Sequence, residues 1–335
     1  MFNRRTILCT AFVAAGLALA PAAQAAEPAK KVVASFSILG DIVKNLGGDR
    51  IEVVTLVGPN GDAHVYQPTP KDARSVSEAD LVIVNGLGFE GWLDRLVEAA
   101  EYKGTVAVAT AGIEALKSDE DHDSEHDKDH DKDHASEESH EHKAEAGHEE
   151  GHDHHHHHGE FDPHAWQSVA NARVYVENLR KALTDIDPSG AETYAANAKS
   201  YLTKLGKLDA EIRSTVASLP VERRKVVTSH DAFGYFGHEY NIEFLAPVGM
   251  STESEASAAD VAHLIRQIKE EKIPAIFVEN ITDRRLLDQI ARETGAVVGG
   301  TLFSDALSGP EGPAGTYVEM MQHNIRTLAT ALSSS

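Results

Sequence analysis

The stretch PSGAETYAANAKSYLTKLGKLDAEIRSTVA, residues 188–217, carries apolar side chains at helical spacing and has no proline after its first residue. Asp187 and Pro188 together are typical of a helix start. At about 1.5 Å of rise per residue, such a helix would be roughly 45 Å long, enough to run down one domain or to connect two. We therefore predict a rigid linker helix over residues 188–218, with the rest of the chain arranged on either side of it.

Apolar runs and amphipathic segments alternate before this linker. The pattern is typical of a parallel sheet with helices packed on its faces. We expect strands at 31–36, 51–57, 81–84 and 106–109, and helices at 38–46, 70–79, 92–100 and 169–179. Residues 27–187 should then form an N-terminal α/β lobe.

The same alternation resumes after the linker, although no letter-by-letter repeat relates the two halves. We expect strands at 225–228, 242–245, 275–278 and 296–298, and helices at 258–271, 284–294 and 317–332. Residues 219–335 should form a second, C-terminal α/β lobe. The predicted fold class is α/β, with two parallel-sheet lobes joined by one long rigid helix.

The first residues have the pattern of an export signal. Arg4 and Arg5 precede an apolar run over residues 7–20, and Ala23-Gln24-Ala25 resembles a cleavage site. We predict a signal peptide over residues 1–26 and a periplasmic mature protein. The single cysteine, Cys9, lies within that segment, so the mature chain should have no thiolate ligand for a metal ion.

Negative charge is concentrated in one segment. The formal net charge is -22, which argues against nucleic acid as a partner, and residues 118–160 hold 17 Asp and Glu against 3 Lys. With 13 of the 19 histidines and almost no apolar side chains, residues 118–159 should be a disordered inserted loop. We expect weaker auxiliary zinc sites there, which would collect, store or sense zinc, among His122, His126, His130, His134, His140, His142, His148, His152, His154, His155, His156, His157 and His158.

Four residues outside this loop are candidate ligands for a single metal ion. His64, His230 and Asp305 follow predicted strands, and His164 opens a predicted helix within Glu160-Phe-Asp-Pro-His-Ala-Trp166. Ligands of open α/β sheets collect beyond the carboxyl ends of the strands, so two facing lobes could bring all four together. Three imidazoles and a carboxylate suit Zn²⁺, whereas Mn²⁺ prefers more oxygen.

The segments around these residues resemble the metal motifs of a known family, the ZnuA-like cluster A-I zinc-binding proteins of ABC importers. Four motifs occur in the family's order and span nearly the whole mature chain: GDAHVYQP at 61–68, DPHAW at 162–166, SHDAFGY at 229–235 and FSDAL at 303–307. The resemblance implies two α/β lobes, one rigid helix, and zinc bound between the lobes. It also favours zinc because manganese-binding relatives have glutamate where this chain has His230. Some relatives use a water or another carboxylate in place of Asp305.

The resemblance also implies a function and partners. It points to a monomeric binding protein, not an enzyme, that delivers Zn²⁺ to an inner-membrane ABC permease, with a zinc-donating metallochaperone as a further partner. A rigid linker disfavours wide closure, so release is expected to involve small shifts around His64 and residues 303–307.

Two other functions remain open from the residues alone. A zinc-dependent hydrolase would need a three-ligand site and a base such as Glu279 or Asp231, but the chain has neither a His-Glu-x-x-His pair nor a Gly-x-Ser-x-Gly turn. A passive zinc buffer or chaperone acting through the loop would leave the ordered motifs unexplained. We interpret Asp162 and Asp231 as hydrogen-bond acceptors or helix caps, and Trp166 as a packing residue. His238, His263 and His323 are expected to be structural or surface residues.

Overall fold

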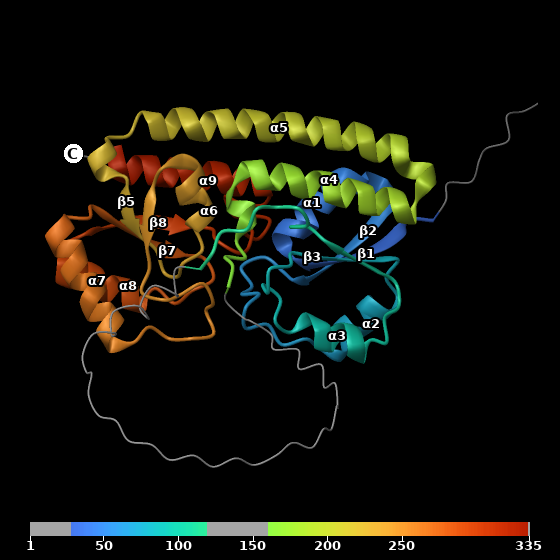
Figure 1. Cartoon of the computed structure of the whole chain (residues 1–335), viewed down its shortest axis with the longest axis horizontal. Coiled ribbons are helices and arrows are strands. Elements are labelled where there is room, and N and C mark those ends of the chain that lie inside the picture. The colour runs from blue at the N-terminus through green and yellow to red at the C-terminus, as the bar shows by residue number, and fades with distance from the viewer. Residues whose placement is uncertain (1–27, 119–159, 334–335) are drawn as a thin grey trace, which may run out of the picture.

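The chain forms two sheets lying side by side under one long helix (Figure 1). The computed structural model describes residues 28–118 and 160–333. The predicted signal peptide and the histidine-rich loop lie outside these residues. Each sheet has four parallel strands, and the long helix α5 (Ala191–Ala217) runs along both. The predicted fold class is confirmed.

The N-terminal sheet has the strand order β2-β1-β3-β4. The strand β1 is central and its run Val32–Phe36 is buried, because parallel strands are covered on both faces. Helices α1 and α4 lie on the side of α5, whereas α2 and α3 cover the opposite side (Figure 1). The elements are β1 (Lys30–Phe36), α1 (Ser37–Gly47), β2 (Ile51–Val57), α2 (Pro70–Ser77), β3 (Leu81–Val84), α3 (Leu93–Ala99), β4 (Thr105–Val108) and α4 (Val169–Ile186).

The C-terminal sheet repeats this topology with the order β6-β5-β7-β8. In both lobes the first strand pairs with the second and the third, so the two sheets have the same winding although their sequences differ. The elements are β5 (Lys225–Val227), α6 (Gly234–Tyr240), β6 (Glu243–Leu245), α7 (Ala258–Glu271), β7 (Ala275–Glu279), α8 (Arg285–Thr294), β8 (Val297–Leu302) and α9 (Tyr317–Ser333).

The strand β8 is longer than the sequence suggests. The sequence predicts a strand over residues 296–298, but β8 runs from Val297 to Leu302. The pairing with β7 shifts register between Ile276 and Phe277. A Cβ atom on Gly299 would lie 2.5 Å from the Phe277 ring, and Gly300 has φ +136°. These glycines therefore permit an irregular strand that continues beyond the predicted end.

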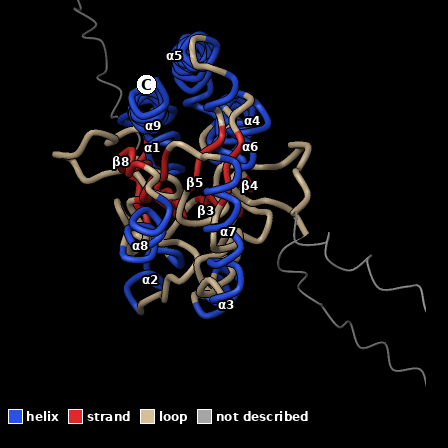
Figure 2. The backbone as a smooth tube through the Cα atoms, turned by 90° about the vertical axis from the view of Figure 1, so that its left-hand side faces the viewer, coloured by secondary structure: helices blue, strands red, loops and turns tan. Residues whose placement is uncertain are grey.

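The long helix is more than a connector. It begins at Ala191 after a 3₁₀ turn over Pro188–Gly190, and its buried side chains recur every three or four residues from Tyr194 to Val216. They pack against α1 and α4 of one lobe and α9 of the other. Viewed end-on, α5 lies above α4 and α9 (Figure 2). Both lobes are therefore bound to the same rigid element.

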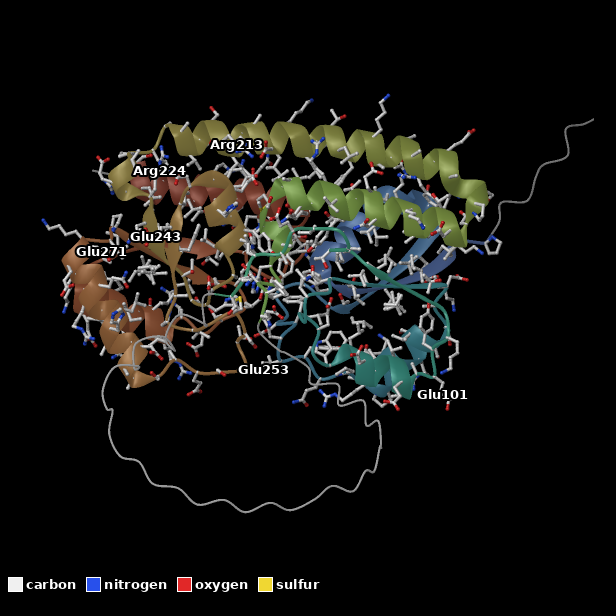
Figure 3. All side chains as sticks on the ribbon, in the orientation of Figure 1. Glu101, Arg213, Arg224, Glu243, Glu253 and Glu271 are labelled. Carbon is white, nitrogen blue, oxygen red and sulfur yellow. The ribbon has the colours of Figure 1, made fainter. Side chains whose placement is uncertain are left out.

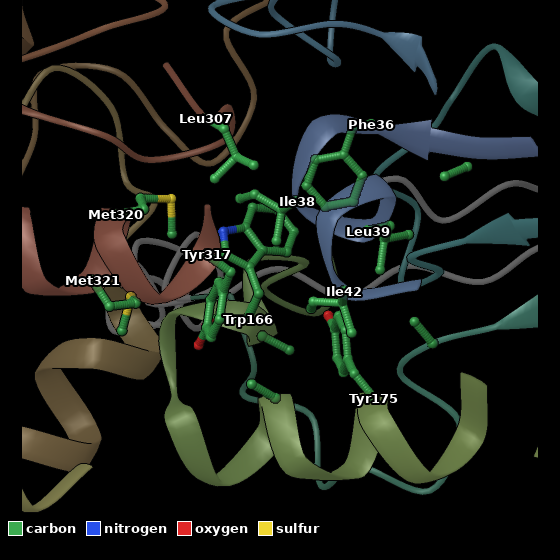
Figure 4. Packing of buried hydrophobic residues seen from close by; sticks show 14 of the residues in the cluster. Phe36, Ile38, Leu39, Ile42, Trp166, Tyr175, Leu307, Tyr317, Met320 and Met321 are labelled. Atoms are coloured by element: carbon green, nitrogen blue, oxygen red, sulfur yellow. The ribbon is translucent and has the colours of Figure 1, made fainter. Parts of the chain in front are cut away.

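The hydrophobic core continues from one lobe into the other. Figure 4 shows Trp166, Leu307 and Tyr317 together at the junction, with Phe36 beside them. The rings of Phe36 and Trp166 are 4.9 Å apart, and the Tyr317 hydroxyl donates to the backbone oxygen of Trp166 at 2.6 Å. Such a shared core resists wide separation of the lobes.

Candidate metal centre

The structure brings the four candidate ligands together between the lobes. His64 lies in the loop after β2 and His164 at the start of the 3₁₀ turn Ala165–Gln167, while His230 follows β5 and Asp305 follows β8. Their ligand atoms all lie within 4.8 Å of one another. His64 is 8% exposed and the other three are fully buried. Each lobe contributes two of the four side chains.

The distances between these atoms match the edges of a small coordination polyhedron. Asp305 Oδ2 lies 3.2 Å from both His64 Nε2 and His230 Nε2, and Asp305 Oδ1 lies 3.7 Å from His164 Nε2. His64 Nε2 and His164 Nε2 are 3.4 Å apart. A tetrahedron with metal–ligand distances of about 2.0–2.2 Å has edges of roughly 3.3–3.6 Å. One divalent ion of that size therefore fits between the four side chains.

The buried charge of the Asp305 carboxylate also indicates that a cation binds here. Both of its oxygens are buried, and no group among the described residues makes a well-formed hydrogen bond to either of them. An ionised carboxylate without compensation is costly in the protein interior. The imidazole nitrogens around it cannot all donate to it and remain neutral, whereas one metal ion can bind all four groups.

The Asp305 carboxylate and the rings of His164 and His230 shift each other's pKa values. Burial alone would raise the pKa of Asp305, but His230 and His164 outweigh it and hold that pKa well below its ordinary value. Burial would lower the pKa of His230, yet Glu279 and Asp305 raise it well above the ordinary value. The pKa of His164 is likewise raised, because Asp305 and Asp162 outweigh burial. Without metal the carboxylates thus favour protonated imidazoles, and an incoming metal ion must displace those protons.

Two histidines are oriented by carboxylates on their other ring nitrogen. Asp162 Oδ1 lies 2.8 Å from His164 Nδ1 and also accepts the backbone N–H of His164 at 2.9 Å. Glu279 Oε2 lies 2.6 Å from His230 Nδ1, and its Oε1 accepts the backbone N–H groups of Ser229 and His230. Such contacts keep the proton on Nδ1 and direct the Nε2 lone pair to the centre of the site.

His64 is held differently. Within the described residues, Asp305 is the only carboxylate paired with its ring. Its backbone N–H donates to Asp62 Oδ1 at 2.9 Å, and Asp62 Oδ2 accepts from the Thr252 hydroxyl of the other lobe at 2.7 Å. The His64 ring packs edge-on against Phe89, with ring centroids 4.9 Å apart. The loop is therefore positioned by a contact between the lobes and by packing.

A family model described as "Zinc-uptake complex component A periplasmic" matches residues 32–331. The chain belongs to this family, ZnuA. The iron-binding protein YfeA of Yersinia pestis is 35% identical over 299 residues, which cover 89% of this chain and 85% of YfeA. Similar solved structures include the periplasmic zinc binding protein TroA from Treponema pallidum, at TM-score 0.76 and 30% identity, covering 91% of this chain and 99% of TroA. A manganese-bound mutant of a periplasmic metal binding protein from Candidatus Liberibacter asiaticus has TM-score 0.75 and 33% identity, covering 90% of this chain and 99% of that one.

ZnuA membership defines the general function. The protein is a metal-binding, substrate-binding component of an ABC transporter, and its partners are a divalent metal ion and a permease. It is a receptor and not an enzyme, so the hydrolase alternative is set aside. Among the residues that the structure describes, no helix is both long and apolar enough to cross a membrane.

The remaining residues singled out in the sequence lie around the centre or away from it. Trp166 is fully buried, in keeping with a packing role. His323 is half-buried, with its Nε2 3.0 Å from the Thr301 backbone oxygen, whereas His238 and His263 are exposed. Asp231 is not one of the four grouped residues; its backbone N–H donates to the Val248 oxygen at 3.1 Å. The loop histidines lie outside the described residues.

Two residues that support the site were not assigned this role from the sequence. We nominated Glu279 only as a possible hydrolytic base, whereas it faces His230 Nδ1 from the end of β7. Asn85, directly after β3, donates to the backbone oxygen of Pro163 at 2.8 Å and so fixes the residue before His164. A polar residue ending a buried strand was the available signal in both cases.

Proposed function

We propose that this ZnuA family member is a periplasmic, high-affinity zinc receptor, with His64, His164, His230 and Asp305 as the ligands. The observation that carries the proposal is the donor set: three imidazole nitrogens and one carboxylate in a buried, closed site. Four protein ligands leave no open position for a reactive water, as suits binding and release. TroA is named a zinc binding protein, whereas YfeA is named iron-binding, so the choice of metal rests on this chain's own donors.

Delivery to the permease completes the proposed function. Residues 1–26 direct export, a zinc-donating metallochaperone is a further partner, and histidines of residues 118–159 collect zinc for the buried site. The shared core and α5 restrict lobe movement, so release proceeds through small shifts of residues 303–307 and of the His64 loop.

The test is a competition titration with Zn²⁺ and Mn²⁺ on the mature protein with and without residues 118–159. One tight zinc should remain after the deletion, and His230→Ala should lower its affinity at least about 100-fold. His263→Ala, an exposed change on α7, is the matched control. Loss of all tight binding on deletion, or an unaffected His230→Ala variant, would contradict the proposed site.

Zinc preference needs a separate measurement. Most N/O sites bind zinc more tightly than manganese, so the ratio of the two affinities is not decisive by itself. The informative quantity is how much the ratio of zinc affinity to manganese affinity changes in His230→Glu. This substitution replaces a nitrogen donor by an oxygen donor and should bring the two affinities closer together. An unchanged or wider ratio would argue against His230 as the residue that favours zinc.

A further inference from the structure

The two chain segments that flank residues 119–159 are joined to each other beside the metal centre. Lys117 and Phe161 form an antiparallel bridge, and the Ser118 N–H donates to the Glu160 oxygen at 3.1 Å. The Asp162 N–H donates to the Leu116 oxygen at 2.9 Å. Asp162, which orients His164, is thus the last residue of a short two-stranded ladder.

A tyrosine from the other lobe holds the end of this ladder. The Tyr235 hydroxyl donates to the Asp162 backbone oxygen at 2.9 Å and accepts the Leu116 N–H at 3.1 Å. Tyr235 is 4% exposed, and burial raises its pKa to about 12. It therefore keeps its proton at physiological pH and makes both hydrogen bonds at once.

The residue before Tyr235 makes room for the Asp162 carboxylate. A Cβ atom on Gly234 would lie 2.5 Å from Asp162 Oδ2, which is closer than real Cβ contacts allow. Gly234 is the first residue of α6, four positions after His230. One short piece of chain therefore carries His230 and also touches the carboxylate that orients His164.

The helix α6, which carries Gly234 and Tyr235, is itself fixed to α5. Arg213 projects from α5 (Figure 3) and pairs with Glu239 of α6, and its guanidinium lies 5.2 Å from the centre of the Tyr240 ring. The Tyr240 hydroxyl donates to Asp209 of α5 at 3.0 Å. The surface offered to Asp162 consequently has a fixed position relative to the element that spans both lobes.

We propose that Gly234 and Tyr235 are positioning residues that set Asp162, and through it the His164 ring, from across the lobe interface. Neither residue is among the four grouped ligands, yet metal affinity depends on both. The inference rests on the proposed metal-binding function and adds a route by which the C-terminal lobe controls a ligand of the N-terminal lobe.

Tyr235→Phe in the full mature chain tests this directly. The ring stays in place while the hydroxyl is lost, so the Asp162–His164 pair is less firmly held. Changing a group that directly supports a ligand typically costs 10–100-fold in affinity, and for this more remote group we expect about tenfold weaker Zn²⁺ binding. Gly234→Ala should weaken binding at least as much, because the added methyl group displaces the carboxylate. Tyr102→Phe is the matched control: it removes a tyrosine hydroxyl that donates to the Thr105 backbone oxygen at 3.1 Å, outside the contacts described above, and should leave affinity within about twofold.

Zinc binding at one equivalent can be followed by tryptophan fluorescence against a competing chelator. Both tryptophans of the chain lie near the site: the Trp166 ring is 5.3 Å from that of His164, and Trp92 donates to the oxygen of Ala63, next to His64. In an Asp162→Asn background the effect of Tyr235→Phe should shrink below about twofold, because the two residues act in series. Amide exchange at Leu116 should accelerate in Tyr235→Phe, since its acceptor is gone.

The outcomes separate this inference from the function on which it rests. If the wild-type protein bound no zinc at the site, the proposed function would fail. If the wild type bound zinc and Tyr235→Phe bound it equally well, only the positioning role would be overturned. Equal losses of affinity in Tyr235→Phe and Tyr102→Phe, or full additivity of Tyr235→Phe with Asp162→Asn, would mean that Tyr235 has only a general structural role and would also overturn the inference.

Discussion

The indole N–H of Trp166 donates to the backbone oxygen of Ser304 at 2.9 Å. Trp166 is two residues after His164, and Ser304 immediately precedes Asp305, so one hydrogen bond ties a ligand segment of the N-terminal lobe to one of the C-terminal lobe. The Gln167 side chain donates to the same oxygen at 2.9 Å. The relative position of His164 and Asp305 is therefore set by hydrogen bonds within the chain before any metal ion binds.

Trp166→Phe should weaken both the fold and the site. It removes buried ring volume and one of two donors to Ser304, with an expected loss of about 2–4 kcal/mol in the free energy of unfolding of the metal-free protein. Urea denaturation measures this. With Gln167→Leu added, the Ser304 oxygen loses both donors, and the combined loss should exceed the sum of the single losses. Simple additivity would show that the shared oxygen is unimportant.

Glu279→Gln should lower zinc affinity by about 10–100-fold, because the charge that keeps the His230 proton on Nδ1 is lost while the shape is kept. Isothermal competition titration is the measurement. Glu271→Gln is a suitable control, since Glu271 pairs with Lys225 near the surface of the same lobe. An affinity equal to that of the wild type would mean that Glu279 does not orient the ring.

Zinc affinity should fall as the pH is lowered, and the fall should begin above the ordinary histidine range. Neighbouring carboxylates raise the pKa values of His164 and His230, so protons compete with zinc at higher pH than for free imidazole. Each displaced proton adds about a tenfold change in affinity per pH unit. Titrations between pH 5 and pH 9 at roughly unit spacing would measure the slope.

Asp305→Asn provides the check on that pH dependence. Asp305 is one cause of both raised pKa values, so the metal-free variant should show lower pKa values for His164 and His230 by NMR. Unchanged values would locate the cause elsewhere.

Asp187→Asn should destabilise the turn between α4 and α5 by about 2–3 kcal/mol at neutral pH. Asp187 is buried and accepts from Arg50 at 2.8 and 3.0 Å and from the Tyr194 hydroxyl at 2.6 Å. The Arg50 guanidinium holds the pKa of Asp187 far below its ordinary value. Its stabilising effect is therefore present above the unfolded pKa of about 3.9 and is lost as the pH falls below it.

The difference between wild type and Asp187→Asn should consequently shrink in acid, as measured by thermal unfolding at several pH values. Asp185→Asn breaks an exposed pair with Lys181 and should cost less than about 0.5 kcal/mol. A comparable cost at the two positions would contradict the role given to burial.

Much of the fold could be predicted because local patterns determined it. The helix α7 spans Ala258–Glu271 as expected, since its amphipathic run is bounded by Ser257, which caps it, and Lys272. The helix α6 was missed because Gly234 and Gly237 lower its helical propensity. A Cβ atom on Gly237 would lie 2.6 Å from the Ile242 oxygen, so a tertiary contact requires that glycine. Packing between elements outweighs local preference there.

The metal centre, like the fold, could be predicted from the sequence only in part. Its four candidate ligands stand in short motifs with turn-forming neighbours, so their chain positions were visible. Glu279 and Tyr235 act on residues about 50 and 70 positions away in the chain, and no spacing rule reaches across such distances. Their roles depend on how β7 and α6 come to lie against β5 and the Asp162 segment.

The ladder between residues 116–118 and 160–162 brings the two ends of the intervening segment together. Because Ser118 and Glu160 are hydrogen-bonded neighbours, both sheets can form whatever the number of residues between these two positions. Each doubling of a flexible loop costs only about 0.6 kcal/mol of closure free energy. Residues 119–159 could thus be shortened, extended or replaced by a reporter domain without changing the strand order of either sheet. This junction is therefore a suitable insertion site beside the metal centre.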